Sequence, residues 1–249
     1  RFDLPLGWEK WLLDLVAIAT VSDMVSLTGE NRLLTYYGLK VLRQTKRLGL
    51  RTLLAKMKIR PANVVEDDIS FMLGPRINSA SRMSHASQAF YLLTTSDLAE
   101  AEAIATHLEE KNQERKEAVE RIVKEITLKL DEHPSAGGLP ALIVMGSPDW
   151  NLGVLGMTSS KIMEKYGRPV FLWSQNEAGV IKGSCRSDGS YNVVELMREA
   201  EKVAGAPYFQ GFGGHPMAGG FSLEAGKEAL LAEYLILASQ NIPPLDVIK

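Results

Sequence analysis

The sequence has 249 residues, of which 45% are hydrophobic, and a formal net charge of −2 with a pI near 6.2. That length supports one large or two ordinary globular domains, and no apolar run approaches the roughly 20 residues that a membrane-spanning helix needs. The single cysteine, Cys185, excludes an internal disulfide and a cysteine-built zinc site. A cytoplasmic location is the expectation, and any site for a polyanion must be local because the net charge is slightly negative.

Residues 1–95 are expected to be mostly helical. The segment 11–27 is apolar and ends on a polar turn, and Thr28 is a candidate N-cap for the helix that follows. Short helices are also predicted, at 49–58, 66–74 and 85–93. Because the sequence begins with Arg1, a few residues before this structured segment, we expect that it was cut from a longer chain.

The segment 97–130 predicts one long amphipathic helix, since apolar or small residues recur along it at helical spacing. At 1.5 Å per residue it would extend on the order of 50 Å. Its polar middle, "EEKNQERKE", indicates a solvated stretch that bridges two bodies. The alternative is a coiled-coil oligomerisation arm, which the broken heptad at 111–115 disfavours.

After a linker at 131–140, the pattern changes to alternating strands and helices. Strands are predicted at 141–147, 168–174, 179–187 and in "MAGGFSL", and helices at 152–166, 192–200 and 225–239. This alternation indicates an α/β fold with a small mixed sheet. We therefore place the domain boundary in the linker, with the long helix as the connector.

Two polar clusters in the helical part could carry chemistry. Asp23 ends an apolar segment, and a buried carboxylate there would be either a helix cap or a metal ligand. In "GPRINSASRM", the donors of Arg76, Asn78 and Arg82 suit phosphate oxygens, although such a segment can also be an ordinary polar helix start.

Two further clusters lie in the α/β part. In "KGSCRSDGS", strand alternation places Lys182, Ser184 and Arg186 on one face, which suits a phosphate or carboxylate but also an ordinary charged edge strand. The stretch "GFGGHPMAGGF" at 211–221 places His215 among glycines. A glycine-rich turn there would present backbone N–H groups to an anion, with His215 as a further donor.

Taken together and in this order, these segments resemble the carboxy-terminal part of the catalytic core of the RecJ family. RecJ proteins are single-strand-specific 5′ exonucleases of the DHH phosphoesterase superfamily. The resemblance is carried by "LDLVAIATVSDMVSL", "LGPRINSASRM", "WNLGVLGMTSSKIMEKYGRPV", "KGSCRS" and "FGGHPMAGGFSL". It implies that 1–95 is the C-terminal part of a DHH domain, 96–131 a connector helix, and 132–249 a DHH-associated domain that binds substrate.

The resemblance also implies roles for particular residues. Asp23 would be a ligand to catalytic Mn²⁺ or Mg²⁺ in a two-metal site. The substrate-binding residues would be Arg76, Asn78 and Arg82 at the metal cleft and Ser184, Arg186, Gly213, Gly214 and His215 at the nucleotide. Single-stranded DNA would be the partner, and the roles would be DNA repair and recombination.

The sequence departs from the family pattern in two respects. Asn151 stands where the family usually has a histidine, which leaves any polar contact there open. The Asp-His-His triad and the upstream aspartate motifs are missing, so Asp23 cannot hold two metals by itself. The chain alone is expected to be inactive and to need an N-terminal DHH half, upstream or as a separate chain. The alternatives are a non-catalytic nucleic-acid-binding module or subunit, and a phosphodiesterase of short oligonucleotides.

Overall fold

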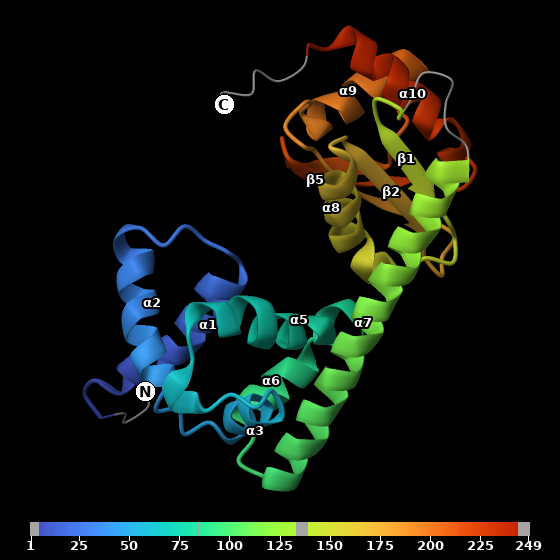
Figure 1. Ribbon diagram of the computed structural model, residues 1–249. Coiled ribbons are helices and arrows are strands. Elements are labelled where there is room, and N and C mark those ends of the chain that lie inside the picture. Colours follow the sequence, from blue (N-terminus) through green and yellow to red (C-terminus); the bar gives the residue numbers. More distant parts are fainter. Residues whose placement is uncertain (1–4, 84, 133–138, 244–249) are drawn as a thin grey trace. The chain divides into compact units, whose positions relative to one another are not determined.

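The computed structural model describes residues 5–83, 85–132 and 139–243. The chain divides into two compact units, Arg1–Arg115 and Lys116–Lys249. One helix, α7 (Leu98–Glu132), contributes to both and is the long green helix of Figure 1. Within the described ranges, no helix has the length and apolar character needed to cross a membrane.

The first unit is built from helices, as the sequence predicts. They are α1 (Leu13–Ser22), α2 (Gly29–Leu42), α3 (Leu48–Lys56), α4 (Glu66–Asp68), α5 (Gly74–Met83) and α6 (Ser87–Thr94), with 3-10 turns at Trp8–Leu12 and Pro61–Asn63 and a π-helical turn at Ile69–Leu73. Fully buried leucines at helical spacing, such as Leu50, Leu53 and Leu54 on α3, form its core.

The second unit holds a mixed sheet. Its strands are β1 (Ile143–Gly146), β2 (Val170–Gln175), β3 (Ile181–Arg186), β4 (Gly211–His215) and β5 (Ala218–Leu223), in the order β1-β2-β3-β5-β4. Only the β1–β2 pair is parallel among these strands. The helices are α8 (Leu155–Tyr166), preceded by a 3-10 turn at Leu152–Val154, α9 (Val193–Ala204) and α10 (Glu228–Asn241).

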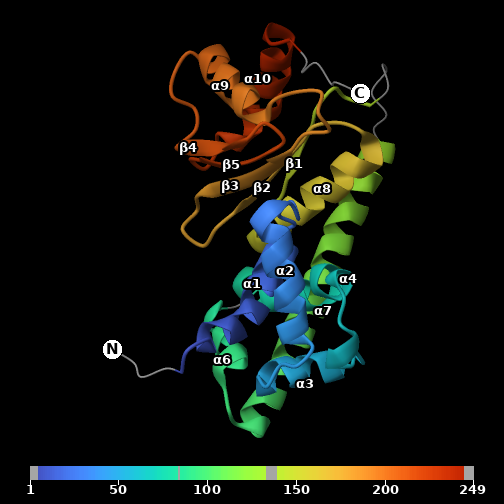
Figure 2. The same cartoon turned by 90° about the vertical axis from the view of Figure 1, so that its left-hand side faces the viewer.

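The two faces of this sheet are covered differently. Figure 2 shows α9 and α10 on one side and α8 on the other. Side chains alternate between faces, so Phe171, Cys185 and Phe221 join the core under α9 and α10. On the opposite face, α8 lies against β2 and β3. This α/β architecture with a long preceding helix confirms the predicted fold class.

One local expectation is wrong, because the glycine cluster is not an open loop. Residues 211–215 form strand β4, which pairs with β5 in a hairpin whose turn is Pro216 and Met217. The turn is tied to its neighbours, since the N–H groups of Val193 and Ser187 donate to the carbonyls of Pro216 and Met217 at 2.9 Å each. Part of the backbone expected to bind an anion is therefore used in the sheet. Most of the predicted linker at 131–140 lies outside the described residues.

Candidate functional site

The predicted site residues fall into two groups, one in each unit. Asp23 lies at the end of α1, where the chain leaves the helix with φ −89° and ψ 3°. The side chain of Asp23 is exposed, so the argument from a buried carboxylate does not hold for it. Among the residues that the structure describes, no group of three or more His, Cys, Asp or Glu side chains could hold a metal ion.

Arg76 on α5 is already engaged by a carboxylate. Its guanidinium donates from two nitrogens to the two carboxylate oxygens of Glu109 on α7, and Nη1 donates to the Met72 carbonyl at 2.9 Å. The Arg76 side chain is only 12% exposed. The partner of Arg76 in this structure is thus Glu109, and its predicted role at a substrate phosphate stays a prediction.

Positive charge nevertheless gathers around Arg76. Burial, followed by repulsion from Arg82 and Arg76, lowers the pKa of Arg115 below its usual range. Arg82 is exposed and Asn78 is half-buried on the same helix, α5. Three guanidiniums thus act on one another within this unit, and Arg82 presents its charge to solvent.

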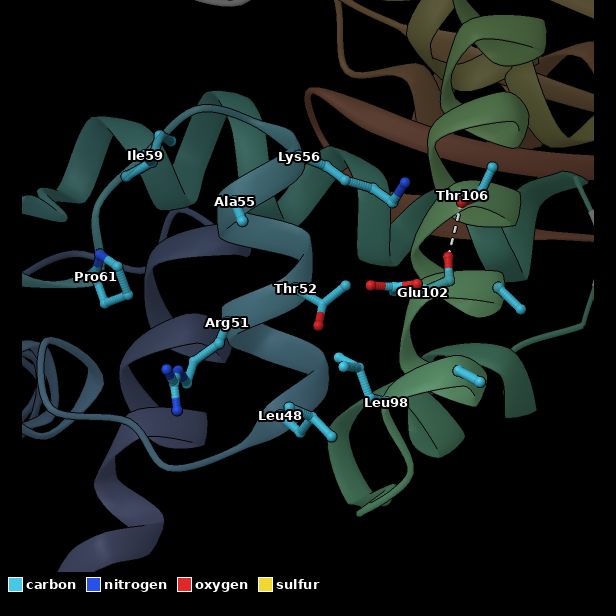
Figure 3. Close-up of a pocket in the computed structure, with 12 residues that line it drawn as sticks. Leu48, Arg51, Thr52, Ala55, Lys56, Ile59, Pro61, Leu98, Glu102 and Thr106 are labelled. Carbon is cyan, nitrogen blue, oxygen red and sulfur yellow. Dashed lines mark hydrogen bonds between the residues drawn. The ribbon is translucent and has the colours of Figure 1, made fainter.

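A separate cavity of about 980 Å³ lies between α3 and α7 in the first unit. Figure 3 shows Thr52 and Lys56 of α3 facing Glu102 of α7 across it. The rest of its lining is mainly aliphatic or small, and none of the predicted site residues belongs to it. It offers no arrangement of nucleophile and base, so we do not assign chemistry to it.

In the second unit, three predicted side chains fall on a single face of the sheet. Arg186 of β3 pairs with Ala218 of β5, and Ala218 pairs with His215 of β4. Because directly opposed residues project to the same side, Arg186 and His215 share a face, with only an alanine between them. Ser184 lies two residues before Arg186 and projects to this side as well.

The Arg186 side chain is positioned by its surroundings. Nη1 donates to Ser184 Oγ at 3.2 Å and to the Cys185 carbonyl at 2.7 Å. A Cβ at Gly156, in the first turn of α8, would lie 3.0 Å from Arg186 Nη2 and 3.3 Å from Ser184 Oγ. Gly156 therefore makes room for the guanidinium beside a helix N-terminus, and both carry positive potential.

The glycines of β4 and β5 divide into two classes by face. On the side of α9 and α10, a Cβ at Gly214 would lie 2.3 Å from the Ala218 carbonyl oxygen, and one at Gly219 would lie 2.9 Å from the Gly213 carbonyl oxygen. Gly214 also has φ +141°, which favours glycine. Internal packing thus accounts for these two.

The other face carries glycines that packing does not require. A Cβ at Gly213 would meet nothing within 4 Å, and at Gly211 and Gly220 only ordinary contacts of 3.8 and 3.4 Å. Gly213 pairs with Gly220, and Gly220 pairs with Ser184. A strip of bare backbone, Gly211, Gly213 and Gly220, therefore lies on the same face as Arg186 and His215. We name these glycines together with Ser184, Arg186 and His215 the glycine-strip site.

Comparison with known proteins decides what this unit is. Residues 139–239 match the DHHA1 domain family. This segment is a DHHA1 domain. Relatives that match most of the chain include the single-stranded-DNA-specific exonuclease RecJ of Bacillus subtilis, which is 38% identical over 217 residues. That match covers 86% of this chain and 26% of the relative, so the chain spans about a quarter of its length.

Solved structures agree with the sequence relationship. RecJ from Thermus thermophilus in complex with Mg²⁺ superposes with a TM-score of 0.79 at 31% identity, covering 97% of this chain and 36% of RecJ. The same protein in complex with Mn²⁺ gives the same TM-score and identity and is covered over 34%. The chain is thus a relative of RecJ, as its motifs indicated, and RecJ structures with both divalent metals exist.

Sequence reasoning missed two members of the glycine-strip site, Gly211 and Gly220, and their neighbour Gly156 on α8. Gly156 and Gly220 matter because of what lies across from them, and only the placement of α8 and the register of β5 show this. The sequence held a weak signal for Gly156 in "NLGVLG", where a glycine stands in the first turn of a predicted helix. Asn151, the departure from the family pattern, accepts the Gly153 N–H at 2.8 Å and begins the turn before α8.

Proposed function

We propose that this chain supplies the nucleotide-holding part of a metal-dependent 5′–3′ single-stranded-DNA exonuclease. In this proposal 1–95 is the C-terminal part of a DHH domain, 96–131 the connector and 132–249 the substrate-binding DHHA1 domain. The observation that carries it is the glycine-strip site, where a cation and an imidazole share a sheet face with backbone that no side chain shields. Relatives that are named single-stranded-DNA-specific exonucleases support it.

The chemistry of the glycine-strip site suits a nucleotide at the end of a strand. Arg186 and the hydroxyl of Ser184 would hold a phosphate through charge-assisted hydrogen bonds. The sugar and base would lie on the strip at Gly213, where a Cβ would otherwise stand between ligand and backbone. His215, exposed at the end of β4, would donate to a second phosphate oxygen, so it binds substrate and is not a metal ligand.

Metal-dependent hydrolysis requires groups beyond the described residues. Bound Mn²⁺ or Mg²⁺ would activate water and stabilise the charge that develops on the phosphate. Asp23 is exposed and stands in no described cluster of three ligands, so these residues do not make up the metal site. The proposal therefore assigns the remaining ligands to a DHH half. A cytoplasmic role in DNA repair and recombination belongs to the same proposal.

A substitution at Arg186 tests the phosphate grip. Binding of a 5′-phosphorylated oligothymidylate should weaken about tenfold in Arg186→Ala, and the slope of log affinity against log salt should become shallower by about one. His215→Ala should show a smaller loss of the same kind. The matched control is Arg168→Ala, an exposed arginine that precedes β2. Equal affinities of Arg186→Ala and Arg168→Ala for the oligothymidylate would show that Arg186 does not bind the phosphate.

An activity assay separates this proposal from its alternative, a non-catalytic nucleic-acid-binding module. The absence of a metal-holding cluster among the described residues favours that alternative for the chain by itself. With Mn²⁺ and labelled single-stranded DNA, we expect no nucleotide release from the chain alone and release after a DHH half is added. Release by the chain alone would contradict our assignment of the metal site. Preferential cleavage of dinucleotides would instead identify a phosphodiesterase of short oligonucleotides.

A further inference from the structure

A second surface, in the first unit, combines exposed aromatic rings with lysines. Trp8 and Trp11 lie in the 3-10 turn before α1, and their exposed fractions are 42% and 46%. Tyr36 and Tyr37 on α2 are exposed to 55% and 48%. Large aromatic rings usually bury most of their surface, so four half-exposed rings on adjoining elements form an unusual patch.

Trp11 lines two cavities within this patch. One, of about 600 Å³, is lined by Trp8, Trp11 and Lys46 among others, and one of about 570 Å³ by Trp11, Tyr37, Lys10 and Lys40 among others. Val41 of α2 lines both, so the two hollows adjoin along one wall. We name them together the Trp11 groove.

Two lysines of the Trp11 groove, Lys40 and Lys46, lie over aromatic rings of the patch. Lys40 Nζ is 4.3 Å from the centre of the Tyr36 ring and 5.4 Å from that of Tyr37, as the i,i+4 and i,i+3 spacings on a helix permit. Lys46 Nζ lies 5.5 Å from the centre of the Trp11 ring. Each ammonium therefore lies close to an aromatic ring, and both lysines are exposed to solvent.

The groove presents almost no negative charge. Asp14 is the acidic member among its described lining residues, and its side chain is 3% exposed and bound to Arg47 Nε at 2.8 Å. Lys10, Lys40 and Lys46 are exposed. The exposed lysines therefore favour an anionic ligand, and the exposed aromatic rings favour one that also carries flat rings.

We propose that the Trp11 groove binds single-stranded nucleic acid, with bases stacked on Trp8, Trp11 and Tyr37 and phosphates near Lys40 and Lys46. Stacking on aromatic side chains between lysines is how strands are held without reading their sequence. None of the described residues that line the groove belongs to a strand, so the groove provides no strand edge for an extended peptide. This contact is separate from the glycine-strip site and does not depend on it.

The test uses the full 249-residue chain and oligothymidylates of about 4 and about 20 nucleotides, without metal. We expect Trp11→Ala to weaken binding of the longer strand by about fivefold or more. For the longer strand, Lys46→Ala should make the slope of log affinity against log salt concentration shallower by about one. Trp11→Phe retains a ring and should keep most of the affinity. Phe90→Ala and Arg60→Ala, which remove an exposed ring and an exposed cation outside the groove, are the matched controls.

The outcomes separate this proposal from its competitors and from the glycine-strip site. Loss in Trp11→Ala with unchanged binding in Phe90→Ala supports the groove, and Arg186→Ala measured alongside reports the other site independently. If Trp11→Ala melts like the parent chain and binds the longer strand equally well, the proposal is wrong. It is also wrong if an acidic aromatic peptide protects Trp11 from quenching by acrylamide and the oligothymidylate does not.

Discussion

Gly213 and Gly219 lie close together in the β4–β5 hairpin, yet replacement by alanine should have different effects on stability and on nucleotide binding at the two positions. A Cβ at Gly213 meets nothing within 4 Å, whereas at Gly219 it would lie 2.9 Å from the Gly213 carbonyl oxygen and 3.1 Å from Cys185 Sγ. Gly213→Ala should keep the melting temperature of the chain but weaken nucleotide binding. Gly219→Ala should be destabilised by roughly 1–3 kcal/mol. Thermal unfolding and oligothymidylate titration of both variants check this, and equal nucleotide affinity in Gly213→Ala and the parent would argue against a ligand on the strip.

The buried thiol of Cys185 makes the stability of the second unit depend on pH in the alkaline range. Burial raises the pKa of its thiol from 9.0 to about 12. The unfolded chain therefore loses the proton first, so this contribution to stability is complete below pH 9 and is lost as the pH rises towards 12. Urea unfolding across that range should show a decline that is less steep in Cys185→Ala. Part of the decline will remain in Cys185→Ala, because burial also raises the pKa of Tyr208 to about 12. An identical decline in parent and variant would contradict this account.

At the scale of elements, one ion pair joins three helices of the first unit. Asp14 on α1 accepts from Arg47 Nε at 2.8 Å, Arg47 precedes α3, and its Nη1 donates to the Leu93 carbonyl of α6 at 3.2 Å. Removing one partner of such a pair leaves a poorly compensated charge in a region of low exposure. Asp14→Asn should therefore lower the free energy of unfolding of this unit by about 3 kcal/mol. Denaturant unfolding measures it, with the exposed Asp67→Asn as the control that should change little.

At the scale of the whole molecule, each unit has its own hydrophobic core. Each core can in principle melt independently, because the apolar contacts that hold it are internal to its unit. We expect calorimetry to resolve two transitions. Asp14→Asn should shift only one of them and Gly219→Ala only the other. A single transition that both variants shift equally would show that α7 couples the units into one cooperative block.

The sequence predicted most of this architecture because the strongest patterns are local. The period of the long helix, the strand alternation around Ser184 and the helices of residues 1–95 all follow from spacing along the chain. Prediction from the sequence failed where a feature depends on a contact with a residue that is distant in the sequence. The ion pair of Arg76 was not predicted because nothing in its own segment indicates Glu109, and the glycine cluster looked like a loop because strand pairing depends on the opposite strand. The Trp11 groove escaped prediction for the same reason.

The bare strip on β4 and β5 also bears on selectivity. Discrimination among the four bases requires side chains that reach the donors and acceptors at their edges. Gly211, Gly213 and Gly220 have no such groups, and Ala218, which pairs with His215 on the same face, has none either. A terminal nucleotide resting there would be sensed by the room it occupies and by its phosphate, whatever base it carries. The exonuclease proposed above would need this indifference, because a new nucleotide of any sequence would enter the same position after each cleavage.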